Sequence, residues 1–358
     1  MPQCTRRIIS ARAPTCPPDV SLERLIAMTG APETPPPLPR LLVVLNPSTG
    51  RYNADSLTAL LERELNGRYE IHLLETRPDI LVTETVSALV DSAAVVLACG
   101  GDGTVSAVAS ALVGRDIPLA ILPAGTTNII AQGLGIPADP LVACQVLRGE
   151  ALTVAIDVAQ VNDRYILHMG GAGYDAHVMS MTSRASKRGF GLSAYLLFGA
   201  RGLLDQPIVE FTIRIDDRII RERGWMALVA NGSDVAFRGM RVGPDISSTD
   251  GLLDLVLFTA PSPWDAAVSF MSIATRRYRS PYLRYERGRQ IEIHADPPLP
   301  VEFDGDPSGT TPFIAEVRPL ALNVLIPSRN GGILGPWIRR SLQNLIPPQD
   351  IGLMPPEY

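Results

Sequence analysis

Short, fully apolar runs alternate with longer mixed stretches along the first part of the chain. Residues 41–45 (LLVVL), 93–98 (AAVVLA) and 117–122 (IPLAIL) contain no polar position. Runs of this kind are typical of parallel strands that are covered on both faces. We expect helices between and after them, over these ranges: 56–66, 80–92, 105–113 and 139–147. Strands that alternate with helices predict an open parallel sheet over residues 41–150.

The pattern changes after residue 151, where short β-rich segments follow one another. We expect strands over these ranges: 153–160, 165–168, 208–215, 225–230, 252–258, 290–295 and 320–326. One helical interruption is expected at about residues 172–204. The fold class predicted for the chain is an amino-terminal open parallel α/β domain, followed by a mostly antiparallel β-sandwich domain over residues 151–327.

The two ends differ from these domains. Residues 1–40 are rich in proline and lack sustained periodicity, so we expect a flexible leader there. Residues 328–358 combine Trp337 and several aliphatic side chains with Arg339 and Arg340. This composition predicts a short amphipathic helix, which either lies in a membrane interface or packs on the body of the protein.

Composition limits the class of protein. With 358 residues, 46% of them hydrophobic, the chain can bury a large core. No apolar run approaches the roughly 18 residues that span a bilayer, and no signal-peptide core is evident. We expect a cytoplasmic protein, with a peripheral position at the inner membrane face as an open option. The four cysteines lack metal-ligand spacing and predict reduced thiols. A net charge of −5 argues against nucleic acid as a partner.

A glycine-rich turn follows the apolar run at 93–98 and carries the first candidate chemistry. It reads Gly100, Gly101, Asp102, Gly103 and Thr104, and a helix is expected directly after it. Glycines let the backbone approach an anion closely, and the N-terminus of the helix presents free N–H groups to it. The turn therefore predicts a nucleotide phosphate site. Its carboxylate is expected to hold Mg²⁺ or the acceptor hydroxyl, because it would repel phosphate.

Two similar loops follow the other apolar runs. Residues 46–50 read NPSTG and residues 123–128 read PAGTTN. Loops at the carboxyl ends of parallel strands meet at one edge of the sheet, where such folds bind ligands. Lys187 is the only lysine, and its surroundings fit neither a Walker A loop nor a protein kinase.

These segments together resemble the diacylglycerol kinase and sphingosine kinase superfamily, most closely its bacterial soluble lipid kinases. The order of NPSTG, GGDGT and PAGTTN is similar to that of the family's catalytic domain. Three later segments continue the resemblance: GGAGYDA at 170–176, DGLLD at 250–254 and DGD at 304–306. The six motifs cover roughly residues 40–327.

The resemblance implies ATP and Mg²⁺ as cofactors, with ATP bound by residues 41–150 and the lipid by residues 151–327. Carried over by position, the nucleotide contacts are Asn46, Ser48, Thr49, Gly50, Thr76, Gly100, Gly101, Asp102, Gly103, Thr104, Thr126, Asn128 and Asp306. Thr76 also fits a plain residue at the end of a strand.

Two acids are implied to be catalytic. Asp304 matches the first acid of the family's DGE segment and is expected to act as the base, while Asp102 manages charge at the γ-phosphate. Asp306 stands where the family has Glu, and its side chain is shorter by one methylene. Taken alone, residues 304–309 also fit an ordinary hairpin loop.

The DGLLD segment is implied to hold a structural Mg²⁺. Its ligands would be the Asp250 carboxylate and the backbone carbonyls of Ser247 and Leu252, an oxygen set that suits a hard cation. A hairpin without a metal remains the alternative.

The function that these expectations imply is ATP-dependent phosphorylation of a lipid hydroxyl, with diacylglycerol first among the acceptors. Sphingoid bases, ceramide-like lipids and other glycerolipids stay open. A relative of NAD kinase or phosphofructokinase is the alternative enzyme, and a catalytically silent lipid-binding protein is the alternative of another class.

The expected partners are the membrane lipid substrate and an anionic membrane surface, and a homodimer remains open. Six arginines and one acid lie within residues 276–289 and fit either a surface for anionic headgroups or a solvated face.

Overall fold

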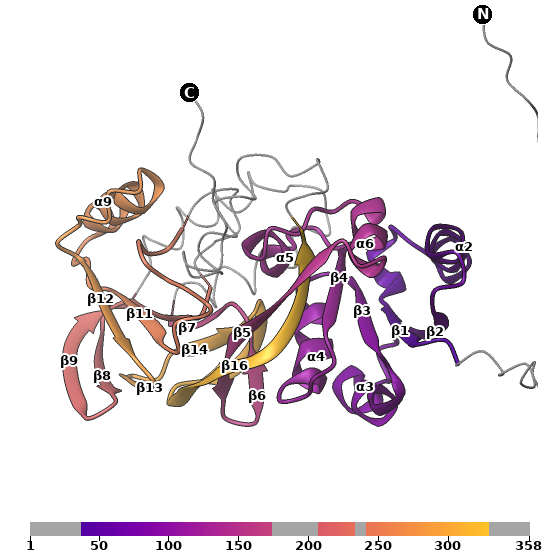
Figure 1. The fold of residues 1–358 in the computed structure, drawn as a ribbon. Helices are drawn as coiled ribbons and strands as arrows, with labels where there is room; N and C mark the ends of the chain where they lie inside the picture. The colour runs from indigo at the N-terminus through magenta and orange to yellow at the C-terminus, as the bar shows by residue number, and fades with distance from the viewer. Residues whose placement is uncertain (1–36, 174–206, 233–240, 329–358) are drawn as a thin grey trace, which may run out of the picture. The chain divides into compact units, whose positions relative to one another are not determined.

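The computed structural model describes residues 37–173, 207–232 and 241–328, and Figure 1 shows how their helices and strands are arranged. The predicted helix at about 172–204 and the tail at 328–358 lie almost entirely outside these residues, as does the predicted leader. None of the helices in the described ranges is long and apolar enough to cross a membrane.

The α/β part has four neighbouring parallel strands in the order β2-β1-β3-β4. Their bounds are β1 Arg40–Leu45, β2 Glu70–Glu75, β3 Val95–Gly100 and β4 Leu119–Pro123. The helices are α2 Ala54–Leu65, α3 Val82–Leu89, α4 Asp102–Leu112, α5 Ile129–Gly133 and α6 Pro140–Leu147, with short 3₁₀ turns η1 Pro47–Thr49 and η2 Val90–Ser92. The predicted alternation of strands and helices is confirmed.

Both faces of these parallel strands are covered, as their apolar sequences predict. One face packs with α3, α4 and α5 in a cluster that includes Val44, Val96, Val108 and Ile121. The other face packs with α2 and α6 in a cluster that includes Leu45, Leu57, Leu97 and Leu147. Every residue of β3 and β4 is buried.

The long strand β16, Phe313–Pro327, joins this parallel region to antiparallel strands. It pairs in parallel with β4 and antiparallel with β5 and β13. The main path of the sheet is thus β2-β1-β3-β4-β16-β13-β8-β9. The added strands are β5 Ala151–Val161, β6 Arg164–Ile166, β8 Val209–Ile215, β9 Arg218–Gly224 and β13 Gln290–Asp296. The domain boundary at residue 150 stays a prediction, and this sheet crosses it.

A second, all-antiparallel sheet has the order β12-β11-β10-β7-β14-β15. Its strands are β7 Met169–Gly173, β10 Met226–Ala230, β11 Leu253–Phe258, β12 Leu283–Gly288, β14 Pro300–Phe303 and β15 Asp306–Thr310. One face packs against the antiparallel part of the first sheet, with Val229 and Leu255 in the same core as Phe211 and Ile291. The predicted β-sandwich is therefore confirmed.

Helix α9, Pro263–Ala274, covers the other face of the second sheet. Its Ala266 and Ile273 share a buried cluster with Val256 and Phe258 of β11. No helix is predicted here from the sequence.

Candidate active site

The three predicted phosphate loops start at neighbouring strand ends. Leu45 pairs with Cys99 and Gly100 pairs with Pro123, so the loops after β1, β3 and β4 leave the sheet side by side. Asn46 Nδ2 donates a hydrogen bond of 2.9 Å to Thr104 Oγ1, which joins the first loop to the second. The sheet thus brings together two residues that lie 58 positions apart in the sequence.

Close glycine contact joins the second loop to the third. A Cβ atom on Gly125 would lie 2.6 Å from the Cα of Gly101, and one on Gly100 would lie 2.5 Å from the Cβ of Thr104. Real Cβ atoms essentially never approach so closely, so a side chain at Gly125 would push the two loops apart and one at Gly100 would displace Thr104. Gly101 is also the N-cap of α4 and provides no side-chain cap. The first turn of α4 therefore keeps backbone N–H groups available for an anion.

Asp102, in the first turn of α4, accepts hydrogen bonds from the third loop. Its Oδ1 accepts from the Ile130 N–H at 3.0 Å and its Oδ2 from the Thr127 hydroxyl at 3.1 Å. The first of these donors belongs to the first turn of α5. Asp102 therefore positions the PAGTTN loop, and its predicted role at the γ-phosphate stays a prediction.

The remaining predicted nucleotide residues shape the loops around this junction. Asn46 Oδ1 accepts from the Ser48 N–H and hydroxyl, and the Thr49 hydroxyl donates to the Asn46 carbonyl. Gly50 ends η1 with φ +70°, which glycine adopts without strain. Asn128 closes the third loop through both side-chain atoms on Gly125.

Three further predicted residues lie at the surface of the loops. Thr126 and Gly103 are exposed, and Thr76 is half-exposed directly after β2, where its N–H donates to the Leu45 carbonyl. Their predicted nucleotide contacts remain predictions.

Asp304 lies in the turn between β14 and β15 and holds that turn against α4. Its backbone is left-handed, with φ 49°, a conformation that Asp tolerates better than most residues. Oδ2 accepts from the Ser106 hydroxyl and the Leu167 N–H, each at 2.9 Å. Oδ1 accepts from the N–H groups of His168 at 3.0 Å and Met169 at 3.2 Å. Every lone pair of the carboxylate is thus engaged.

Opposing effects act on this carboxyl group. Burial raises the pKa of Asp304 above its ordinary value, while the hydrogen bonds from Leu167, His168 and Ser106 and the nearby His168 ring act to lower it. Burial dominates. A carboxyl group with a raised pKa is a stronger base once it is ionised, which suits the role predicted for it.

Asp306 faces the glycine-rich turn. Its Oδ2 lies 3.9 Å from the position that a Cβ atom on Gly103 would occupy. Burial raises the pKa of Asp306, and the positive charge of Arg164 acts in the opposite direction. The hairpin that the residues of 304–309 suggest is present, and it carries both acids to the N-terminus of α4. Carboxylate and hydroxyl oxygens of this kind fit a magnesium-bound nucleotide.

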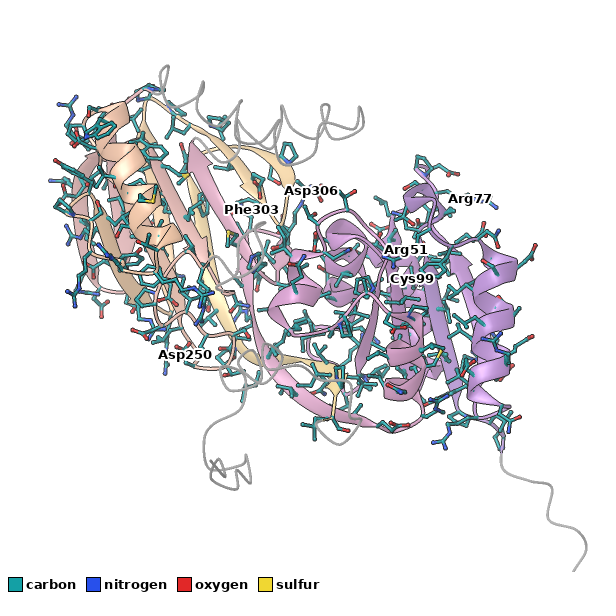
Figure 2. The ribbon with its side chains drawn as sticks, turned by 90° about the horizontal axis from the view of Figure 1, so that it is seen from above. Arg51, Arg77, Cys99, Asp250, Phe303 and Asp306 are labelled. Carbon is teal, nitrogen blue, oxygen red and sulfur yellow. The ribbon has the colours of Figure 1, made fainter. Side chains whose placement is uncertain are left out.

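The DGLLD segment lies elsewhere, and Figure 2 shows Asp250 well separated from Asp306. One guanidinium group is placed among the acids of this segment. Arg287 donates to Asp250 Oδ2 at 2.8 Å, to Asp254 Oδ1 at 2.7 Å and to the Asp245 carbonyl at 2.6 Å.

This arrangement bears on the predicted structural Mg²⁺. The other carboxylate oxygen of Asp250 accepts from the Leu252 N–H, and the Ser247 hydroxyl bonds to Thr249. Within the described ranges, no group of three or more His, Cys, Asp or Glu side chains is arranged to hold a metal. Arg287 thus supplies a positive charge beside the Asp250 carboxylate, and the Mg²⁺ predicted at Asp250, Ser247 and Leu252 stays a prediction.

Two side chains with clear roles, Ser106 and Asp157, were not identified from the sequence. Ser106 lies four residues after Asp102, so both share one face of α4, and that spacing could have indicated it. Buried Asp157 accepts from the Gly251 N–H at 2.7 Å and the Leu320 N–H at 2.8 Å. No local pattern reveals such a contact, because its partners lie far along the chain.

The cysteines in the described part of the chain are as expected. Cys99 and Cys144 are free and buried, and burial raises the pKa of Cys99 to about 12 and that of Cys144 to about 11. Both are therefore thiols at neutral pH.

Comparison with known families divides the chain into two matches. Residues 40–161 match the diacylglycerol kinase catalytic domain. Residues 169–326 match the YegS C-terminal NAD kinase beta sandwich-like domain.

Individual relatives agree with these matches. The "Probable lipid kinase YegS-like" of Pseudomonas aeruginosa strain PAO1 is 32% identical over 243 residues, which cover 67% of this chain and 79% of that protein. The diacylglycerol kinase of Bacillus subtilis is 26% identical over 286 residues, 76% of this chain and 91% of that protein. A crystal structure of a diacylglycerol kinase from Bacillus anthracis has the same fold, with a TM-score of 0.61, 19% identity, and coverage of 80% and 96%.

Proposed function

Because this chain belongs to the YegS-like family of bacterial lipid kinases, with a diacylglycerol kinase catalytic domain and a YegS C-terminal domain, we propose that it phosphorylates a lipid hydroxyl and that diacylglycerol is the acceptor. The catalytic domain implies ATP as the donor. When bound, ATP would supply the phosphoryl group and Mg²⁺ would offset its negative charge.

The observation that carries the proposal is the contact between two distant segments. The Ser106 hydroxyl on α4 bonds to Asp304, 198 residues later, and Asp306 lies against Gly103 at the start of the same helix. The acids of the β14–β15 turn therefore face the helix N-terminus that is suited to a phosphate. A base and a phosphoryl donor need this proximity for direct transfer to a hydroxyl group.

Each part of the site has a task in this proposal. The loops at Asn46, Gly101 and Thr126 bind the nucleotide through hydroxyl and backbone groups. Asp102 keeps the second and third loops together. Asp304 accepts the proton of the lipid hydroxyl. Of the four hydrogen-bond donors to Asp304, only the Ser106 hydroxyl belongs to a side chain. The lipid hydroxyl reaches the carboxylate by taking the place of this Ser106 hydroxyl.

The test is transfer of labelled phosphate from ATP to purified lipids. The panel contains a diacylglycerol, a monoacylglycerol, a sphingoid base and a ceramide, with NAD as a non-lipid acceptor. We expect labelling of diacylglycerol above the others, and Asp304→Asn to lower kcat by about a hundredfold or more. If another lipid is labelled instead, the acceptor is that lipid. If only NAD is labelled, or if the protein binds lipid without transferring phosphate, the proposal is wrong.

Asp216 offers a matched control for Asp304. It lies in the β8–β9 turn and also has a left-handed backbone, with φ 49°. Its carboxylate accepts from the N–H groups of Arg289 and Gln290. Asp216→Asn makes the same chemical change in the same kind of turn, away from the phosphate loops. We expect it to keep wild-type kcat, and equal losses in the two variants would refute the assignment of the base.

A further inference from the structure

Helix α9 exposes a stripe of large apolar side chains. Trp264 is 77% exposed, Val268 41% and Met271 63%. Their spacing of four and three residues places them on one face of the helix. Trp264 has the highest exposed fraction among the exposed large hydrophobic side chains of the described residues.

The helix is well anchored by its opposite face. Ser262 caps its N-terminus by accepting from the Asp265 N–H, and Pro263 occupies the first turn. Ala266, Ser269 and Ile273 are buried, and the Ser269 hydroxyl lies 2.9 Å from that of Ser280. Because the opposite face of α9 packs on the second sheet, the exposed stripe lies on the side of the helix away from that sheet.

Three arginines come directly after this stripe in the sequence. Arg276, Arg277 and Arg279 are exposed in the loop after α9. Arg277 and Arg279 form no ion pair with any other described residue. The sequence has no Asp or Glu between Asp265 and Glu286.

The structure thereby divides the arginine cluster at 276–289. Arg284 pairs with Glu222 and Glu286, and Arg287 pairs with Asp250 and Asp254. These two stabilise the protein's own acids. Among the described residues of this cluster, Arg277 and Arg279, next to the apolar stripe, are exposed and lie outside these pairs, as does Arg289.

We propose that α9 and the loop 276–279 form a docking surface for an anionic phospholipid bilayer. An exposed Trp beside aliphatic side chains suits the boundary between headgroups and acyl chains, and nearby arginines attract anionic headgroups. Charge complementarity selects this partner, because the surface is locally basic on a protein with a net charge of −5. The inference rests on the proposed function, since an enzyme that acts on a membrane lipid must reach a membrane.

The experiment is sedimentation of the full chain with vesicles, without ATP. The vesicles contain phosphatidylcholine alone or phosphatidylcholine mixed with phosphatidylglycerol. We expect binding to the anionic vesicles only. Arg277→Gln with Arg279→Gln should weaken it roughly thirtyfold, and Trp264→Ala with Met271→Ser at least about tenfold.

Matched controls separate this surface from general effects. Arg221 and Arg223 are two exposed arginines with the same spacing on β9, so their double change to Gln alters charge equally. Leu81→Ser removes a 66% exposed apolar side chain at the start of α3. Both controls should bind as wild type does. Equal loss in the arginine controls, or unchanged binding of the α9 variants, would overturn the proposal.

Two further measurements complete the test. If Trp264→Ala with Met271→Ser changes self-association in sedimentation velocity but not vesicle binding, the stripe contacts a second copy and the proposal is wrong. Phosphorylation of a water-dispersed short-chain diacylglycerol should stay unchanged in the α9 variants. Vesicle binding without any phosphorylation would refute the proposed function alone.

Discussion

The hydroxyl group of Ser106 on α4 donates a hydrogen bond of 2.9 Å to the carboxylate of Asp304, 198 residues later in the chain. This contact fixes the β14–β15 turn against the helix that starts at the glycine-rich loop. It also adjusts the acidity of Asp304, because a donor to an ionised carboxylate stabilises that form.

The first prediction concerns the pH dependence of kcat/KM, which reports the free enzyme, where the Ser106 hydroxyl still donates to Asp304. A base must be ionised, and burial raises the pKa of Asp304, so the acid limb should lie above the ordinary Asp value of about 3.9. Ser106→Ala removes a donor that stabilises the ionised form, which should move the limb to still higher pH. Ser110→Ala is the control, since Ser110 lies one turn later and donates to the Ser106 carbonyl. An acid limb that stays in place in Ser106→Ala would contradict the assignment.

The second prediction concerns the contact between Gly101 and Gly125. Gly125→Ala would place a methyl group 2.6 Å from the Cα of Gly101, so the loops must separate. We expect a loss of about 1–3 kcal/mol in unfolding free energy and a raised KM for ATP. Gly103→Ala is the contrast, because its methyl group would meet only Asp306, at 3.9 Å, and alanine favours a helix. Urea denaturation should show no loss for Gly103→Ala, and equal losses would refute the argument.

The third prediction concerns Arg287. Its removal leaves Asp250 and the buried Asp254 without the cation that they share. Arg287→Gln should therefore lower the free energy of unfolding by about 1–3 kcal/mol. Arg284→Gln breaks more exposed pairs and should cost less than about 1 kcal/mol. Denaturant unfolding measures both variants.

The same site makes a prediction about metal removal. Because Arg287 supplies the positive charge, EDTA should leave the Tm of the nucleotide-free protein unchanged. A fall in Tm on chelation, restored by Mg²⁺, would show that a metal shares this site with Arg287.

The fifth prediction concerns Asp157, since burial raises the pKa of its carboxyl group. A folded-state pKa above the unfolded value means that folding favours the protonated form. The contribution of Asp157 is therefore most favourable below about pH 3.9 and decreases as the pH rises through the raised pKa.

Asp157→Asn tests this sign. The N–H groups of Gly251 and Leu320 each donate to one oxygen of Asp157, but the amide of Asn has a single acceptor oxygen. The variant should therefore lose about 1–3 kcal/mol of unfolding free energy at acidic pH. This loss should shrink as the pH rises, because only the wild type then carries a buried charge. A loss that grows with pH in urea titrations would refute the direction of the shift.

Much of the fold follows from sequence patterns. Apolar runs predicted β1, β3 and β4, and the rule for strand ends placed the loops after them at one edge. Strands β9 and β12 were missed, because RIIRERG and LRYERG carry charges that local patterns assign to loops. Their pairing with β8 and β11 stabilises them as strands.

Two further departures have local causes. Helix α9 was missed because Trp, Val, Phe and Ile also favour strands, although Ser262 and Pro263 form a good helix start. Strand β16 was predicted only from residue 320, because Pro319 and a register shift between Arg318 and Leu322 interrupt its pattern. Asp157 accepts the Leu320 N–H at this irregularity. Contacts such as this one connect distant residues, which periodicity cannot reveal.

The position of β16 has a consequence for synthesis on the ribosome. Strands β4 and β5 both pair with β16, which is translated about 160 residues after β5 begins. Until then the α/β part has an unpaired, apolar sheet edge, which can attract other chains. Folding of the nucleotide-binding region is therefore completed late in translation, and chains truncated before Phe313 are expected to aggregate rather than accumulate as a stable fragment.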